Sequence, residues 1–533
     1  MSQPFVNKKN LNKKTNFKNE KINLRKTNAN FVEIMDTTLR DGEQTEGVSF
    51  SINEKLSIAK KLLQDVKVDR IEIASAKVSE GEKESCCAIF SWAKENQLLD
   101  RVEVLGFVDI NKSVDWINEA GGCVINLLCK GSEKHCRRQL NKTPKQHFND
   151  IKKTIEYAHS KNFVVNAYLE DFSNGIKSSK KYVYDLVKVL NKNKVKRILL
   201  ADTLGIFSPV DVEKYVSLLV KKFAGQQFDF HAHNDYGLAT ANSLASINAG
   251  CLGLHVTVNG LGERTGNAAL EQIVPGVADF TLLKTRVNEK KLAQVSRLVE
   301  LFSKRRVAKN SPIIGGVVFT QTAGIHADGD KKGELYKSKL SAKRFGRKTT
   351  YALGKLSGKA SVSMALKQLG IILGEDEVKQ VLAKVVALGE KKEFVSKEDL
   401  LFLVDTVKNN GVQKSFKIKK YELFSSSKRK PNAKISVLID GKKYKANAFG
   451  DGGYDAFVTA LKKIFKMKKM NFPELSDYEV RIPVGGKTDA LVETKITWKR
   501  GNKIFKTVGV STDQIEAAIK ATEKMVNIIM KLN

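Results

Sequence analysis

The chain has 533 residues, of which 42% are hydrophobic, and it carries a formal net charge of +34. No apolar run is long enough to span a membrane, which argues against a membrane protein. Only 17 of the 92 basic residues are Arg, and they are spread among lysines along the whole chain, which argues against nucleic-acid binding as the main function. Six cysteines without C-x-x-C spacing fit a reduced, cytoplasmic protein.

Residues 1–30 are rich in Lys and Asn, contain a single acid, Glu20, and lack the apolar segment of a secretory signal. We expect a disordered basic arm.

Short β-like runs alternate with helical segments from Phe31 to about residue 280. Eight such repeats favour a closed (β/α)8 TIM barrel, an α/β fold, over an open doubly wound sheet, and we place this domain at residues 31–285. The predicted strands are 31–35, 70–74, 102–107, 124–129, 163–169, 197–201, 228–231 and 252–258.

A mostly helical linker is expected over residues 286–412. It contains Gly324-Ile325-His326-Ala327-Asp328-Gly329, in which glycines flanking a His and an Asp suggest a mobile catalytic loop, although a plain turn between helices stays an alternative.

The last region, residues 413–533, shows a strand, strand, helix pattern twice. We predict an α+β domain built from an internal ββα repeat, with a regulatory, dimerising role. The predicted strands are 417–424 and 433–447, before a helix at 455–466, and 479–483 and 490–498, continued by 503–508, before a helix at 512–531.

Two histidines, His231 and His233, end the seventh predicted strand. Alternate strand residues share a face, so both imidazoles can reach one metal ion. Histidines at this spacing are more often ordinary surface or core residues, so the assignment needs a third ligand. Asp41, in the loop after the first strand, supplies one, because active sites of TIM barrels lie where the strands end. Asn259 could add an oxygen, or could merely stabilise a turn.

Four motifs of the chain resemble those of the acyl-CoA-dependent 2-oxo-acid condensing enzymes, which are the 2-isopropylmalate, citramalate and homocitrate synthases. The motifs are DTTLRDGEQ at 36–44, HAHND at 231–235, NGLGER at 259–264 and GIHADG at 324–329. The resemblance implies a TIM barrel, a helical linker, an allosteric C-terminal domain, a homodimer, acetyl-CoA as co-substrate, and a divalent metal ion (Mg²⁺, Mn²⁺ or Zn²⁺) bound by Asp41, His231 and His233.

The resemblance also implies roles for other side chains. Arg40 and Thr203 would hold the 2-oxo acid and polarise its ketone. Glu170, together with His326, would remove a proton from the acetyl-CoA methyl group, and Tyr336 would assist. The enolate would then attack C2 of the 2-oxo acid, and the thioester would be hydrolysed.

Several stretches look most like the citramalate synthase branch, among them 104–107, 166–171, 328–333 and 345–348. In that branch Leu105, Leu128 and Tyr168 would line the pocket beside the ketone substituent and leave room for the methyl group of pyruvate. A 2-isopropylmalate synthase, which uses 2-oxoisovalerate, is the alternative within the family. A catalytically silent amino-acid sensor is the alternative of another class.

An amino-acid feedback effector, with isoleucine expected, would bind the C-terminal domain. The same positions also read as ordinary core. The residues that resemble the family's effector pocket are Tyr454, Asp455, Leu475, Tyr478, Ile482 and Val492.

Overall fold

The computed structural model describes residues 30–321, 338–355, 357–390, 395, 397–408, 416–481, 492–501 and 503–530. The chain divides into two compact units. The first runs to Val318 and also takes in Ala342–Arg347, and the second contains Phe319–Ser341 and the chain from Lys348 onwards. Within the described part of the chain, no helix is long and apolar enough to cross a membrane.

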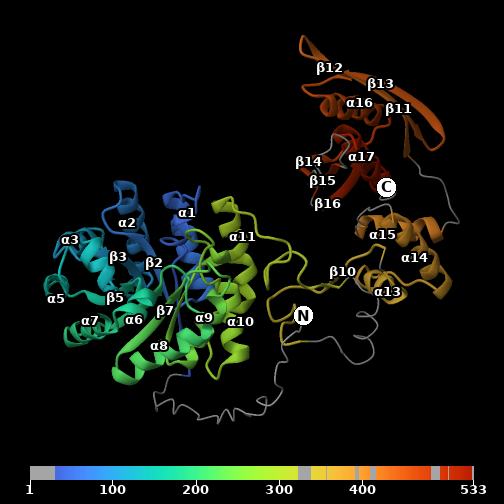
Figure 1. Cartoon of the computed structure of the whole chain (residues 1–533). Helices are drawn as coiled ribbons and strands as arrows, with labels where there is room; N and C mark the ends of the chain where they lie inside the picture. The colour runs from blue at the N-terminus through green and yellow to red at the C-terminus, as the bar shows by residue number, and fades with distance from the viewer. Residues whose placement is uncertain are drawn as a thin grey trace, which may run out of the picture. The chain divides into compact units, whose positions relative to one another are not determined.

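The first unit contains a closed barrel of eight strands in the order β1 to β8, which confirms the predicted fold (Figure 1). All neighbouring strands are parallel, and β1 closes the barrel against β8 with Glu33 opposite Gly253. The strands are β1 (Glu33–Asp36), β2 (Arg70–Ser75), β3 (Val102–Phe107), β4 (Val124–Lys130), β5 (Val164–Glu170), β6 (Arg197–Asp202), β7 (Gln227–Ala232) and β8 (Gly253–Val256).

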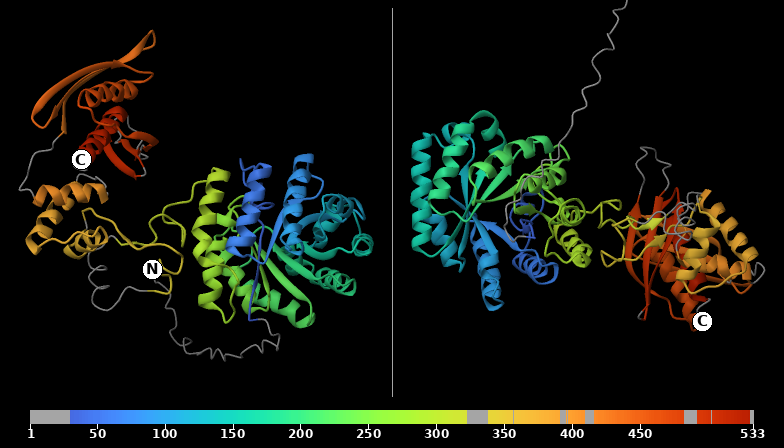
Figure 2. Two further views of the ribbon diagram at one scale, coloured as in Figure 1. Left: turned by 180° about the vertical axis from the view of Figure 1, so that it is seen from behind. Right: turned by 90° about the horizontal axis from the view of Figure 1, so that it is seen from below.

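Helices surround these strands, as the view from below shows (Figure 2, right). They are α1 (Ile52–Lys60), α2 (Glu80–Glu95), α3 (Lys112–Glu119), α4 (Glu133–Arg138), α5 (Pro144–Ser160), α6 (Phe172–Ser178), α7 (Lys180–Lys192), α8 (Pro209–Lys222), α9 (Ala239–Asn248), α10 (Leu270–Phe280) and α11 (Leu292–Ser303). Shorter turns are η1 (Gly42–Gln44), η2 (Lys61–Val66), η3 (Leu99–Arg101), η4 (Val258–Gly260) and η5 (Glu289–Lys291).

The sequence sets where several of these helices begin. Helix α5 opens with Pro144 after Thr143, and α8 opens with Pro209 after Ser208. In both, the hydroxyl of the capping residue accepts a hydrogen bond from the backbone N–H of the third helical residue, and the side chain of that residue accepts one from the backbone N–H of the capping residue. Proline fits the first helical position because its missing N–H has no partner there in any case.

The N-terminal end of the barrel interior holds buried charges rather than an apolar core. Arg70 contacts Glu103 at 2.9 Å and also binds Asp229, while Arg197 contacts Glu33 at 2.7 Å. Buried and partly buried charges are tolerated when each has a partner of opposite sign, and these form one network across five strands, β1, β2, β3, β6 and β7. The C-terminal end of the barrel therefore lies above a layer of paired charges, which we call the charged floor.

Residues 342–347 pack on the barrel unit although most of their sequence neighbours belong to the second unit. Arg344 donates two hydrogen bonds of 2.6 Å to Glu289 and one of 2.7 Å to Asp279. The side chain of Phe345 beside it is buried. This segment fixes one point of the linker to the barrel unit.

The second unit begins with β9 (Thr320–Gln321) and β10 (Thr350–Tyr351), followed by α13 (Lys359–Gln368), α14 (Glu375–Glu390) and α15 (Lys397–Lys408). It continues with two sheets, each followed by a helix: β11 (Phe416–Ser426), β12 (Arg429–Ile439), β13 (Lys442–Phe449) and α16 (Gly453–Met467), then β14 (Glu474–Arg481), β15 (Val492–Arg500), β16 (Lys503–Ser511) and α17 (Gln514–Met530).

The repeat is therefore βββα, and the prediction of a ββα repeat was wrong in this respect. The predicted strand 433–447 is a hairpin, because Asp440 and Gly441 both adopt positive φ, 48° and 80°, between the paired residues Ile439 and Lys442. Asp-Gly is a favoured pair for a two-residue turn of this kind. The helices and both sheets share one core that includes Phe457, Phe465 and Trp498.

Candidate active site

Three side chains meet at the C-terminal end of the barrel. The Nε2 atom of His231 lies 3.0 Å from Oδ2 of Asp41 and 3.3 Å from Nε2 of His233, and His233 Nε2 lies 4.0 Å from the same Asp41 oxygen. All three residues are buried. Ligand atoms about 2.0–2.2 Å from one ion can lie at most about 4.4 Å apart, so these three atoms can share a metal.

The protonation states suit metal binding. Burial raises the pKa of Asp41, but the neighbouring Arg40 guanidinium and the hydrogen bond from His231 outweigh it and hold that pKa well below its usual range. Burial and the nearby His231 lower the pKa of His233 to about 4. An ionised carboxylate and a neutral imidazole are the forms that bind a divalent ion.

Asn267, rather than Asn259, stands at this cluster. Its amide nitrogen donates to Oδ2 of Asp41 at 2.9 Å, and its Oδ1 is buried without a hydrogen bond from any described residue. Asn259 donates to the Ser296 carbonyl at 3.0 Å and accepts from the Ser296 hydroxyl at 2.6 Å. The structure thus contradicts the expectation that Asn259 adds a ligand, because both ends of its amide are bound to α11.

Gly266 brings Asn267 into place. It has a φ of +87°, and a Cβ atom there would lie 1.9 Å from the Gly260 carbonyl oxygen. Only glycine fits such a position. The close approach lets the Asn267 N–H donate to Gly260 and pairs Asn267 with His233 in a β-bridge.

Arg40 lies against the cluster and is fixed on every side. Its Nε donates to Glu72 at 2.6 Å, its Nη2 donates to the Tyr168 hydroxyl at 3.0 Å, and its Nη1 lies 3.4 Å from Asp41. Glu72, on β2, also accepts from Asn126 at 2.7 Å. The planar guanidinium is therefore held in one orientation beside the candidate metal ligands.

The three residues predicted to line the ketone pocket lie together. Leu105, Tyr168 and the partly buried Leu128 pack in one apolar cluster inside the barrel, together with Met35, Leu199 and Ala201. Arg40 also lies over the Tyr168 ring, 5.4 Å from its centre. The apolar cluster thus lies beside the guanidinium of Arg40.

Comparison with known proteins identifies the family. Residues 31–299 match the HMGL-like family, 313–393 the homocitrate synthase post-HMGL domain-like family, and 394–530 the LeuA allosteric (dimerisation) domain. A CimA relative from Archaeoglobus fulgidus is 34% identical over 93% of this chain and 99% of its own length. The chain belongs to the citramalate, 2-isopropylmalate and homocitrate synthase family.

Two relatives from Methanocaldococcus jannaschii show how close the branches of this family are. Its (R)-citramalate synthase CimA is 31% identical over 94% of this chain and 99% of its own. Its 2-isopropylmalate synthase is also 31% identical, over 94% of this chain and 95% of its own. Overall identity to these two proteins does not separate the two activities.

Two of the four remaining predicted site residues, Glu170 and Thr203, lie in the described part of the chain. Glu170 ends β5 and pairs with Lys130, a residue of β4 that the sequence did not single out. The Thr203 hydroxyl accepts from the Asp171 N–H at 2.9 Å, and its carbonyl accepts from Arg264 at 2.7 Å. His326 and Tyr336 lie outside the described residues.

The residues predicted for the effector pocket differ in burial. Tyr454 and Tyr478 lie with ring centres 5.5 Å apart, and the Tyr454 hydroxyl shares a 2.7 Å hydrogen bond with Thr522. Val492 is buried, whereas Leu475 and Asp455 are exposed. Ile482 lies outside the described residues.

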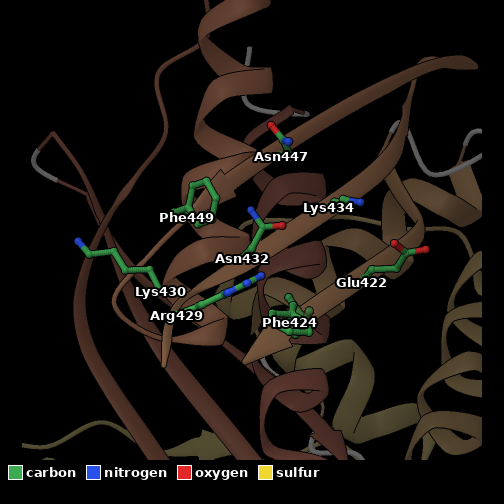
Figure 3. Close-up of a pocket in the computed structure, with 9 residues that line it drawn as sticks. Glu422, Phe424, Arg429, Lys430, Asn432, Lys434, Asn447 and Phe449 are labelled. Atoms are coloured by element: carbon green, nitrogen blue, oxygen red, sulfur yellow. The ribbon is translucent and has the colours of Figure 1, made fainter. Parts of the chain in front are cut away.

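A pocket elsewhere in this domain contains none of the predicted effector residues. It has a volume of about 640 Å³ and lies on β11–β13 (Figure 3). Asn432 stands there between its strand partners Phe424 and Phe449.

Proposed function

We propose that the chain condenses acetyl-CoA with pyruvate and hydrolyses the resulting thioester, as a citramalate synthase does. The observation that carries the proposal is the convergence of Asp41, His231 and His233 beside the fixed guanidinium of Arg40, next to the apolar cluster that contains Leu105, Leu128 and Tyr168.

A divalent metal ion bound by Asp41, His231 and His233 would supply Lewis-acid polarisation of the ketone. Mg²⁺, Mn²⁺ and Zn²⁺ all suit a ligand set of two imidazoles and a carboxylate with open positions. The unbonded Oδ1 of Asn267 suits the same site, because a buried carbonyl oxygen without a donor can accept a cation.

The protein groups would carry the remaining steps. Arg40 holds the substrate carboxylate and balances the negative charge that develops on the ketone oxygen. Glu170 takes a proton from the acetyl methyl group, the resulting enolate carbon forms a bond to C2 of the 2-oxo acid, and the ketone oxygen takes up a proton. Water then cleaves the thioester and releases the CoA thiol.

We expect pyruvate to be preferred over a larger 2-oxo acid, because the bulky side chains of Leu105, Leu128 and Tyr168 pack together and would limit the space beside the ketone substituent. The second candidate is 2-isopropylmalate synthesis, which the similar identity to the enzyme of that name favours. One methylene in such a pocket is worth only about 1–3 kcal/mol, so the margin between the two substrates is small.

A regulatory and dimerising role for residues 413–533 is part of the proposal. The match of residues 394–530 to the LeuA allosteric (dimerisation) domain supports it. Tyr454 and Tyr478 are the two predicted effector residues that the structure brings together, and isoleucine is the effector we expect.

Thiol release from acetyl-CoA, measured with pyruvate, 2-oxoisovalerate and 2-oxoglutarate in turn, tests the proposal. We expect the highest kcat/KM with pyruvate. A preference for 2-oxoisovalerate would replace the proposed activity with 2-isopropylmalate synthesis, and no release with any of the three, with Mg²⁺, Mn²⁺ or Zn²⁺ supplied, would leave a non-catalytic amino-acid sensor.

A further inference from the structure

His255 is a buried histidine of β8 that no part of the proposed reaction uses. It is 1% exposed and lies inside the barrel beneath the active site. Its ring stands edge-on to Tyr168, with centres 5.5 Å apart, and edge-on to His231, at 5.4 Å. A buried imidazole in contact with two active-site rings calls for a role beyond filling space.

The hydroxyl of Tyr168 has three polar neighbours but only one proton. It lies 3.0 Å from Nη2 of Arg40, 3.2 Å from Oε2 of Glu72 and 3.1 Å from Nδ1 of His255. Arginine has no acceptor, so the phenol oxygen accepts from Arg40, and the phenol proton must point at Glu72 or at His255.

Glu72 is already supplied with donors. Its Oε2 accepts from Nε of Arg40 at 2.6 Å, and its Oε1 accepts from Asn126 at 2.7 Å. Nδ1 of His255 has no contact other than the Tyr168 hydroxyl among the hydrogen bonds of the described residues. The arrangement that gives Nδ1 of His255 a hydrogen-bond partner sends the Tyr168 proton to it.

The surroundings of His255 select the tautomer this requires. Its Nε2 faces Oδ2 of Asp229 at 3.6 Å, and Asp229 is held ionised by Arg70. A proton on Nε2 points at that carboxylate and leaves Nδ1 as an acceptor.

We propose that His255 is a positioning residue: Nδ1 accepts the Tyr168 hydroxyl proton and thereby fixes the phenol oxygen as an acceptor for Arg40 at the wall of the ketone pocket. The inference rests on the proposed function, because Arg40 and Tyr168 are its 2-oxo acid site. A line of contacts runs from the charged floor of the barrel to the candidate metal ligands. It passes through Asp229, His255, Tyr168 and Arg40.

The role predicts a specific kinetic pattern. His255→Phe keeps a flat ring but removes the acceptor, so the KM for the 2-oxo acid should rise about 10-fold, the value of one hydrogen bond of about 1.4 kcal/mol, while the KM for acetyl-CoA changes less than about twofold. His255→Asn places an amide oxygen near the position of Nδ1 and should restore the KM to within about threefold of wild type.

A double-mutant cycle with Tyr168→Phe decides whether His255 acts through the hydroxyl. In the Tyr168→Phe background, His255→Phe should change the KM for the 2-oxo acid by less than about twofold. An equal rise in both backgrounds, or an Asn variant no better than the Phe variant, would overturn the proposal and leave His255 a packing residue.

The wild-type enzyme, assayed alongside, separates this inference from the proposed function. A wild type without thiol release refutes the proposed function, whereas an active wild type with additive variants refutes only the role of His255. Circular dichroism melting confirms that each variant is folded, and if His255→Phe does not fold, His255→Leu takes its place in the cycle.

Discussion

Nε2 of His231 lies 3.0 Å from Oδ2 of Asp41, although the two residues are 190 positions apart in the chain. Closure of the barrel makes this contact possible. Because β8 pairs with both β1 and β7, the C-terminal ends of β1 and β7 lie near each other. The candidate metal site therefore depends on closure of the barrel.

Replacing His233 by Ala should abolish turnover and leave the fold intact. The imidazole supplies one of three candidate ligand atoms, and we expect kcat to fall at least about 100-fold and Mn²⁺ affinity, measured by calorimetry, to fall at least about 10-fold. The exposed His159 on α5 provides the control, since His159→Ala should change neither quantity. Near-wild-type activity of the His233 variant would remove the proposed metal site.

Asn267→Ala should weaken metal binding, whereas Asn259→Ala should lower only the stability of the fold. Asn267 bonds to Asp41 and has a free carbonyl oxygen, so its loss should weaken Mn²⁺ binding about 10- to 100-fold. Asn259 is tied to Ser296, so its loss should leave Mn²⁺ affinity unchanged and lower the melting temperature. Calorimetry and thermal melting of both variants check this, and weaker Mn²⁺ binding by the Asn259 variant alone would reverse the assignment.

The choice between these two asparagines shows where sequence reasoning stops. Both follow the eighth strand, both neighbour a glycine, and either side chain could face the histidines. Which asparagine faces the histidines depends on two tertiary contacts, that between Gly266 and Gly260 and that between Asn259 and Ser296 of α11. Neither contact can be read from the sequence. The strands and the His pair were predictable because alternation and barrel topology are local and repetitive patterns.

Other residues were missed for a similar reason. Glu72 and His255 stand inside strands whose apolar runs suggested nothing but core, and only the barrel interior shows that they contact Tyr168. The hairpin at Asp440-Gly441 carried a local signal, the favoured turn pair, and could have been predicted.

Leu105→Ala should move substrate preference from pyruvate toward 2-oxoisovalerate. Removing the side chain opens the pocket wall, and we expect the ratio of the two kcat/KM values to shift about 10- to 100-fold. Leu127→Ala is the matched control, because Leu127 is equally buried but faces away from Leu128 on β4. Both variants should lose stability, and an unchanged ratio in the Leu105 variant would show that this residue does not line the substrate site.

Glu271→Gln should stabilise the protein at alkaline pH. Burial raises the pKa of Glu271 from 4.5 to about 7, although the Asn259 N–H partly opposes the rise. The unfolded chain ionises this carboxyl above about pH 4.5 and the folded chain only above about pH 7, so wild-type stability falls between these values and levels off above them.

The predicted gain of the glutamine variant is therefore near zero at pH 4.5 and up to roughly 3 kcal/mol at pH 8.5, measured as the difference in free energy of unfolding in urea. The exposed Glu156 supplies a control, because Glu156→Gln should show no such trend. A gain that does not change with pH would mean that Glu271 is ionised in both states throughout this range.

We propose that the barrel performs a metal-dependent condensation of pyruvate with acetyl-CoA. Thiol release with pyruvate, measured on protein stripped of metal with a chelator and again after Mn²⁺ is added back, tests it most directly. We predict no release before the addition and restored release after it, with the five-carbon hydroxy diacid, citramalate, identified by mass. Equal rates before and after the addition, or thiol release without that product, would contradict the claim.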